Sequence, residues 1–152
     1  MALSDDIELL SAVPLFSNLD KDQVKLIAFG AEHRVIGPGE ALFREKAPAD
    51  CAYVVVRGRL DLYVMGRGNQ PYKQASAGAG VMLSELALVT MVERKYTAIA
   101  ATETDVLRLT RAIFHRLLEE YPPMARLIQA RIKQSLEDLV KGAAALGHHF
   151  GE

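Results

Sequence analysis

The sequence predicts a single, mainly β domain with helices at both ends, a fold of the sandwich or jelly-roll class. Between residues 32 and 110 the chain is divided into short runs of β-branched and aromatic residues, and Gly and Pro separate these runs. Before and after this region, apolar residues recur every three or four positions, the spacing of a helix that buries one face. Many short strands in succession favour a sandwich or jelly roll over an alternating α/β sheet.

The first thirty residues predict two short helices. Apolar and acidic residues form an amphipathic pattern over residues 4–12, and Pro14 ends it. Asp20 and Gln23 have the spacing of a capping box, and we expect the helix that they begin to stop near Gly30.

Seven strands are expected in the β region. Turns are indicated between them at Gly37-Pro38-Gly39, at Pro48-Ala49-Asp50 and at Gly66-Arg67-Gly68-Asn69. The expected strands are His33–Ile36, Ala41–Arg44, Cys51–Val56, Arg59–Met65, Tyr72–Ala75, Tyr96–Ala101 and Asp105–Thr110.

Helical spacing returns after Leu109. Thr110 is expected to cap a helix over residues 111–120, and Pro122-Pro123 separates it from a longer helix over residues 124–145. The longer helix carries an apolar stripe of Met124, Ile128, Ile132, Leu136, Leu139 and Ala143. Within one domain, residues 1–152, we therefore expect N-terminal helices over 4–30, the β region over 32–110 and C-terminal helices over 111–145.

The composition indicates a soluble protein of the cytoplasm. The 152 residues suffice for one domain with a buried core, and 18 Lys and Arg against 19 Asp and Glu leave a net charge of −1. This balance gives no electrostatic reason to expect nucleic acid or a membrane as partner. No apolar run approaches the roughly 18 residues of a membrane span, and the N-terminus lacks a secretion signal. Cys51 is the only cysteine, and we expect a buried, inert thiol in a reducing compartment.

Residues 78–97 contain the strongest indication of a ligand. Two glycines lead into an apolar segment that opens on Ser84 and Glu85, and Arg94 follows nine positions after the glutamate. The first N–H groups of a short helix starting near Ser84 would attract an anion, and the forked donors of Arg94 suit a phosphate. Glu85 could accept a hydrogen bond from a sugar hydroxyl. An anion held beside a hydroxyl describes a nucleotide.

These residues resemble a known family. The phosphate-binding cassette of the cyclic nucleotide-binding domains is similar to this segment, which reads Gly78-x-Gly80-x-x-x-Ser84-Glu85-Leu86-Ala87-Leu88, followed by Arg94-x-x-Thr97. With further blocks the resemblance runs from about residue 7 to residue 140. These blocks are Pro14-Leu-Phe16-Ser-Asn-Leu19, Pro38-Gly39-Glu40-Ala-Leu-Phe43-Arg, Pro48-Ala-Asp50, Tyr53-x-Val55-x-x-Gly58 and Phe114-x-x-Leu117-Leu118.

The resemblance implies a double-stranded β-helix, or jelly roll, that acts as a cyclic nucleotide sensor rather than an enzyme. Cyclic AMP is the expected ligand and cyclic GMP the second choice, with no cofactor and no metal. Carried over from the family, Arg94 would contact the phosphate and Glu85 the ribose 2′-hydroxyl. The C-terminal helices would relay occupancy to an unknown effector protein, and a homodimer through residues 124–145 is a further hypothesis. The other implied ligand contacts are Leu83, Ser84, Leu86, Ala87, Lys95 and Thr97.

Several residues depart from the family pattern. Ser84 stands where the family prefers glycine, and if the backbone there has a positive φ, a β-carbon costs about 1 kcal/mol or more. Its hydroxyl could compensate by capping the short helix or by donating to the phosphate. Lys95 and Tyr96 replace small residues, and Glu93 replaces proline. Of these departures, Ser84, Lys95 and Tyr96 favour an alternative function, a nucleotide-free interaction module that keeps the sandwich.

The two central residues also have simpler interpretations. Arg94 could be a solvated surface arginine paired with Glu93, as many surface ion pairs are. Glu85 could be an ordinary acid in the first turn of a helix, where the helix dipole favours negative charge.

Other function classes have less support. None of the four histidines has the paired spacing that a metal-dependent enzyme of this fold class needs, and Cys51 has no obvious activating neighbour in the sequence. A transcription factor would need a helix-turn-helix after the long helix, and only about ten residues follow Ala143. The histidines are His33, His115, His148 and His149.

Overall fold

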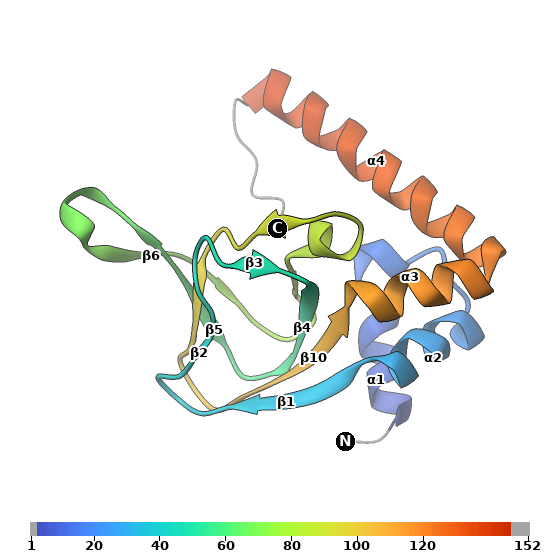
Figure 1. The fold of residues 1–152 in the computed structure, drawn as a ribbon, viewed down its shortest axis with the longest axis horizontal. Coiled ribbons are helices and arrows are strands. Elements are labelled where there is room, and N and C mark those ends of the chain that lie inside the picture. Colours follow the sequence, from blue (N-terminus) through green and yellow to red (C-terminus); the bar gives the residue numbers. More distant parts are fainter. Residues whose placement is uncertain (1–2, 147–152) are drawn as a thin grey trace.

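The structure, a computed structural model, describes residues 3–146. Its strands form a β-sandwich, and helices from both ends of the chain gather beside it, as Figure 1 shows. The fold class is therefore as predicted. The helices are α1 (Leu3–Ser11), α2 (Lys21–Gly30), α3 (Arg111–Glu120) and α4 (Pro122–Leu146), with short 3₁₀ segments η1 (Pro14–Phe16), η2 (Arg67–Asn69) and η3 (Glu85–Leu88).

Two four-stranded antiparallel sheets make up the sandwich. The first has the order β1-β10-β4-β7 and the second the order β2-β9-β5-β6, while β3 and β8 form a separate pair. The strands are β1 (Glu32–Ile36), β2 (Ala41–Phe43), β3 (Pro48–Ala49), β4 (Cys51–Arg57), β5 (Leu60–Met65), β6 (Pro71–Ala77), β7 (Met82–Leu83), β8 (Val92–Glu93), β9 (Thr97–Ala100) and β10 (Thr104–Thr110).

All seven expected strands are present, and three very short ones are additional. The prediction of a turn at Pro48-Ala49-Asp50 is wrong, because Pro48 and Ala49 form β3 and pair with β8. Strands β3, β7 and β8 have two residues each. A strand of this length is too short to show the alternation of apolar and polar residues by which a sequence reveals strands.

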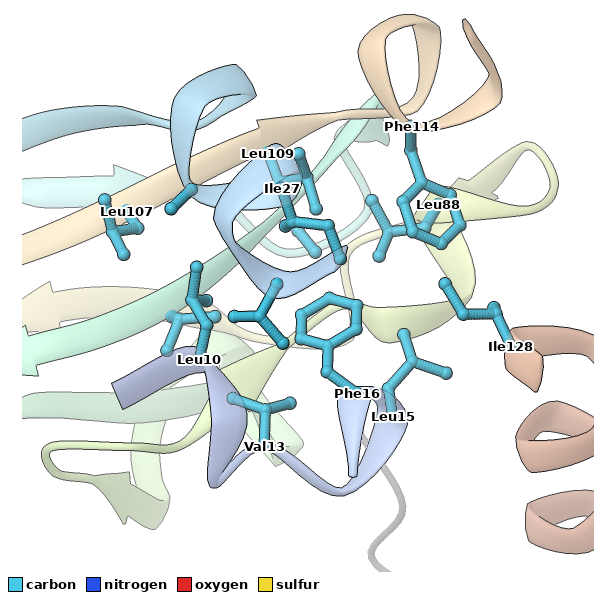
Figure 2. Close-up of a cluster of buried hydrophobic side chains, with 14 of the residues drawn as sticks. Leu10, Val13, Leu15, Phe16, Ile27, Leu88, Leu107, Leu109, Phe114 and Ile128 are labelled. Carbon is cyan, nitrogen blue, oxygen red and sulfur yellow. The ribbon is translucent and has the colours of Figure 1, made fainter. Parts of the chain in front are cut away.

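Two apolar clusters lie on opposite faces of the first sheet. The helix-side core fills the space between this sheet and the helices, and Figure 2 shows that Phe16, Leu88 and Phe114 meet in it. The sandwich interior lies between the two sheets. Because successive residues of a strand point to opposite faces, β4 contributes to both clusters. Ala52, Val54 and Val56 belong to the helix-side core, and Cys51, Tyr53 and Val55 belong to the sandwich interior.

Local hydrogen bonds set the helix ends. The side chain of Asp20 accepts from the N–H of Gln23 at 2.8 Å, and the side chain of Gln23 accepts from the N–H of Asp20 at 3.0 Å, so the predicted capping box is confirmed. Thr110 caps α3, since its hydroxyl accepts from the N–H of Ile113 at 3.2 Å. Helix α4 begins at Pro122, where the missing N–H costs nothing because the first helical N–H groups have no intrahelical partner.

Helix α4 packs on η1 and α3 and leads away from α3 in Figure 1. Met124 and Ile128 are buried in the helix-side core and Ile132 packs against it, so the first half of the predicted stripe belongs to the core. The side chains of Leu136, Leu139 and Ala143, and all of His148 and His149, lie outside the described part of the chain. Between residues 3 and 146, no helix has the length and apolar character needed to cross a membrane.

Candidate ligand-binding site

A left-handed residue precedes the short helix of the cassette. Ser84 has φ 64° and ψ 41° and is buried, and η3 follows it directly. The structure thus requires at Ser84 the positive φ that glycine adopts most readily. The expectation that Ser84 caps the short helix is wrong, because its side chain makes no capping hydrogen bond. Capping residues have an extended backbone, which directs the side-chain oxygen back to the helix N–H groups, and Ser84 does not have this conformation.

Arg94 lies inside the sandwich. Only 5% of the residue is exposed, so the interpretation as a solvated surface arginine is wrong. Nη1 donates to the carbonyl oxygen of Cys51 at 2.8 Å, and Nη2 donates to the thiol sulfur of the same residue at 3.2 Å. The guanidinium carbon lies 4.6 Å from the ring centre of Phe43 and 5.3 Å from that of Tyr53. Two hydrogen bonds and two aromatic rings therefore orient this cation.

Cys51 is buried as expected, but it has a charged neighbour that the sequence did not indicate. Next to it, the rings of Tyr53 and Phe43 stack with centres 5.8 Å apart. Burial raises the pKa of the Tyr53 phenol, and the neighbouring Cys51 adds to this effect. Tyr53 therefore remains a neutral side chain beside Arg94 at neutral pH.

Residues from both ends of the cassette contact β4. Leu83, the residue before Ser84, is the cross-strand partner of Tyr53 in the pairing of β7 with β4. Arg94, near the other end of the cassette in the sequence, donates to the carbonyl of Cys51, two residues before Tyr53 on β4. The backbone of Arg94 is held in place, because its N–H donates to the carbonyl of Ala47 at 2.8 Å. Both segments thus contact β4, while convergence of the Ser84 amides and Arg94 on one phosphate stays a prediction.

A cleft of about 600 Å³ opens beside Arg94. Arg94, Lys95 and Tyr96 line it from the end of the cassette, and Tyr72 and Gln74 line it from β6. The volume is within the range of about 300–1,000 Å³ that is usual for small-molecule sites. Cationic, amide and aromatic groups on its walls suit a ligand that combines an anionic group with a ring.

The rim of this cleft carries both signs of charge. Glu45, Lys46 and Glu93 line it in addition to Lys95. The carboxylate of Glu45 accepts from the N–H of Met65 at 3.0 Å, so it also holds β5. The cleft therefore has one buried cation, Arg94, and an outer edge that carries both acidic and basic side chains.

Not all predicted contact residues line the cleft. Glu85 borders a separate cavity of about 330 Å³, next to Pro14 and Val81. The hydroxyl of Thr97 accepts from the N–H of Glu45 at 3.0 Å, so it stabilises the loop after β2. Arg94 and Lys95 are the predicted contacts that line the cleft itself. Leu83 and Ala87 are buried in the protein, and Leu86 is 41% exposed.

Arg111 is a residue that sequence reasoning missed. Its Nη1 donates to the carbonyls of Ala87 and Thr90, both at 2.9 Å, and to the carbonyl of Ala49 at 3.2 Å. The first residue of α3 therefore holds the cassette and β3 together. No local pattern could reveal this role, because the acceptors are backbone groups, which every residue carries.

A metal centre has no structural support within residues 3–146, where no group of three or more His, Cys, Asp or Glu side chains is arranged to hold an ion.

Comparison with known proteins identifies the family. The family model described as "Cyclic nucleotide-binding domain" matches residues 33–121, which include both sheets, the cassette, Arg94 and Arg111. The chain belongs to this family. Both Ser84 and Arg94 lie within the matched range of this cyclic nucleotide-binding domain.

Individual relatives agree with the assignment. A cAMP-dependent protein kinase regulatory subunit from Blastocladiella emersonii is 33% identical over 112 residues, or 74% of this chain, and the chain spans 28% of that relative. The structure of a cyclic nucleotide-binding-like protein from Brucella abortus is 42% identical, with a TM-score of 0.70 over 76% of this chain and 98% of that one. The N-terminal domain of a transcriptional regulator from Streptomyces coelicolor A3(2) is 26% identical, with a TM-score of 0.82 over 86% and 93% of the two chains.

Proposed function

We propose that this domain binds cyclic AMP, with cyclic GMP as the weaker ligand, and that it reports occupancy through its C-terminal helices. One observation carries the proposal: the buried guanidinium of Arg94 lines a 600 Å³ cleft together with Lys95 and Tyr96, at the end of the cassette. The relative from Blastocladiella emersonii is named as a cAMP-dependent regulatory subunit, which supports cyclic AMP as the first ligand to test.

Arg94 supplies the chemistry of phosphate recognition. A guanidinium has five N–H donors in a planar fork, and the bonds to Cys51 use two of them. A cyclic phosphodiester carries one negative charge and accepts such donors in a charge-assisted, bidentate manner. In the proposed mechanism the phosphate competes with the carbonyl and thiol of Cys51 for Arg94. The aromatic rings keep the cation in the interior during this exchange.

The relay to the C-terminal helices has two structural supports. Leu88, the last residue of η3, shares the helix-side core with Phe114 of α3 and Ile128 of α4 (Figure 2). Arg111, the first residue of α3, donates to the carbonyl of Ala87 in η3 and to that of Thr90 just after it. A ligand that reorganises the cassette would therefore shift the population of α3 and α4 positions, provided that it binds the two arrangements with different affinity.

The proposed output is regulation of an effector protein in the cytoplasm, without catalysis by this domain. A homodimer through residues 124–145 is part of the same proposal, motivated by the apolar stripe of α4. Sedimentation velocity with and without cyclic AMP tests it, and a monomer at every concentration would oppose it.

One alternative has a specific observation in its favour. Glu85 borders a cavity other than the cleft of Arg94, and Arg94 already contacts Cys51 and two rings. A domain that has lost its ligand and serves as an interaction module would show this arrangement. In that case cyclic nucleotides would not bind.

Calorimetric titration distinguishes the two functions. Wild type is expected to bind cyclic AMP more tightly than cyclic GMP, and 5′-AMP serves as the control for a nucleotide without the cyclic phosphodiester. Arg94→Lys keeps the positive charge but loses the forked N–H donors of the guanidinium, and we expect its affinity for cyclic AMP to fall at least about tenfold. Arg116→Lys, on the exposed side of α3, is the matched control and is expected to leave affinity unchanged. Absence of heat with both cyclic nucleotides would favour the interaction module.

A further inference from the structure

A histidine joins the N-terminal helix to the first sheet. His33 of β1 lies between two carboxylates: its Nε2 is 2.8 Å from Oδ2 of Asp6, on α1, and its Nδ1 is 3.0 Å from Oδ1 of Asp105, on β10. Asp6 and Asp105 are buried, with 6% and 5% exposed. The side chain of His33 is 35% exposed, so solvent protons reach it.

With both aspartates ionised, this arrangement favours a doubly protonated ring. A neutral imidazole donates from one nitrogen and accepts at the other, but both nitrogens of His33 face carboxylate oxygens, which only accept. A neutral His33 would place a lone pair against a buried carboxylate. Burial lowers the pKa of His33, but the hydrogen bonds and negative charges of Asp105 and Asp6 outweigh burial and raise it above the usual 6.5.

Asp6 depends on this cation more than Asp105 does. Its Oδ1 is the one buried side-chain oxygen or nitrogen without a hydrogen-bond partner in the described residues. A buried carboxylate with one unsatisfied oxygen is costly unless a cation offsets its charge. His33 is therefore the group that makes the burial of Asp6 tolerable.

Other charged groups near the cluster are paired among themselves or exposed. On β1, Glu32 pairs with Arg108 of β10. On β4, Arg57 stands opposite Asp105 in the ladder and lies 3.8 Å from Glu103. The remaining ionisable neighbours in sequence are exposed: Asp5 and Glu8 on α1, and Arg34 on β1.

We propose that Asp6, His33 and Asp105 form a proton-dependent latch that docks α1 on the first sheet. With His33 charged, its bond to Asp6 holds α1, and its bond to Asp105 fixes the ring on the sheet. When His33 loses its proton, only one ring nitrogen can donate; the bond to Asp6 is lost and α1 loosens. Leu10 of α1 is buried in the helix-side core, and η1, against which α4 packs, follows α1 directly. Loosening of α1 therefore changes the packing of the helix-side core, in which α3 and α4 also bury side chains.

The direction of the pH effect follows from the raised pKa. The stabilisation by the latch is complete below the unfolded-state pKa near 6.5 and is lost as pH rises through the higher folded-state pKa. The latch therefore loses its stabilising effect over the neutral to alkaline pH range. This behaviour does not depend on nucleotide binding.

Thermal unfolding of the full chain between pH 6 and pH 9 tests the latch. The melting temperature of the wild type minus that of His33→Gln is expected to shrink by about 2 °C or more over this range. His115→Gln, which removes an exposed histidine from α3, is the control and should show a constant difference. A constant difference for His33→Gln as well would overturn the proposal.

An NMR titration of the wild type gives a result even if His33→Gln does not fold. The His33 ring signals should titrate with a midpoint above 6.5, and the hydrogen-exchange protection of amides 3–11 should fall through the same midpoint. Asp6→Asn keeps the shape of the side chain and should lower the midpoint, an effect that a purely structural contact would not produce. A wild-type midpoint at or below 6.5 would contradict the latch.

Discussion

Ser84 is a buried serine in a conformation that suits glycine. Its φ of 64° and ψ of 41° place the β-carbon close to the following carbonyl, at a cost of roughly 1–2 kcal/mol. Among the described residues, Lys46 and Asn69 are the other non-glycine residues with positive φ, and both are exposed. The strain at Ser84 therefore lies at a buried position of the cassette, where surrounding packing maintains it.

Substitutions at Ser84 should separate backbone strain from hydroxyl chemistry. Ser84→Gly removes the strain but adds freedom to the unfolded chain, so the free energy of unfolding should change by less than about 1 kcal/mol. Ser84→Val should lower it by about 2 kcal/mol or more, because β-branched residues are rare at positive φ. Urea unfolding measures both changes. Equal losses for the two variants would show that the hydroxyl, and not the backbone, is what matters.

The sequence indicated Arg94 as a candidate ligand contact, but it could not predict the contacts that Arg94 makes within the protein. The arginine stands at a defined spacing from the cassette start, and this spacing carried the phosphate interpretation. Its partner Cys51 is 43 positions earlier, and they meet only because β3 pairs with β8. The sequence contains no sign of pairing between strands of two residues.

At the scale of elements, η3 connects the sandwich to the helices. It contacts β4 on one side and α3 on the other, and Arg111 ties its last carbonyls to the start of α3. Three carbonyl oxygens share one Nη atom of a partly buried cation. A cassette held in this way cannot move independently of α3.

Removal of the Arg111 hydrogen bonds should lower the free energy of unfolding and make the cassette more mobile. Arg111→Met keeps the length of the side chain but leaves three carbonyls without their donor, and we expect a loss of about 2 kcal/mol in the free energy of unfolding. Amides 85–90 should exchange faster with solvent. Arg116→Met, on the same helix but exposed, should change stability by less than about 0.5 kcal/mol. If the two variants behave alike, Arg111 does not hold the cassette.

Elements with a clear period were predictable and very short elements were not. The capping box at Asp20 and the cap at Thr110 are local signals, and both are confirmed. The seven longer strands differ from expectation by one or two residues at their ends. β3, β7 and β8 are stabilised by partners far along the chain, and their own residues do not specify them.

At the scale of the whole molecule, β4 separates the candidate site from the relay. Its alternate residues face the sandwich interior, which contains Tyr53 beside Arg94, and the helix-side core, which contains Leu88. The fold class was predictable because five blocks and the overall pattern agree. The cleft was not, because β6 and the end of the cassette line it together and only the tertiary fold brings them side by side.

A crystal structure of the domain grown with cyclic AMP tests the central claim most directly. The account predicts density for the nucleotide in the cleft, with an exocyclic phosphate oxygen about 2.7–3.2 Å from the guanidinium of Arg94 and close to the backbone N–H groups that begin η3. Arg94 should have exchanged its bonds to Cys51 for the phosphate. A nucleotide bound elsewhere, or an empty cleft with Arg94 still on Cys51, would contradict the account.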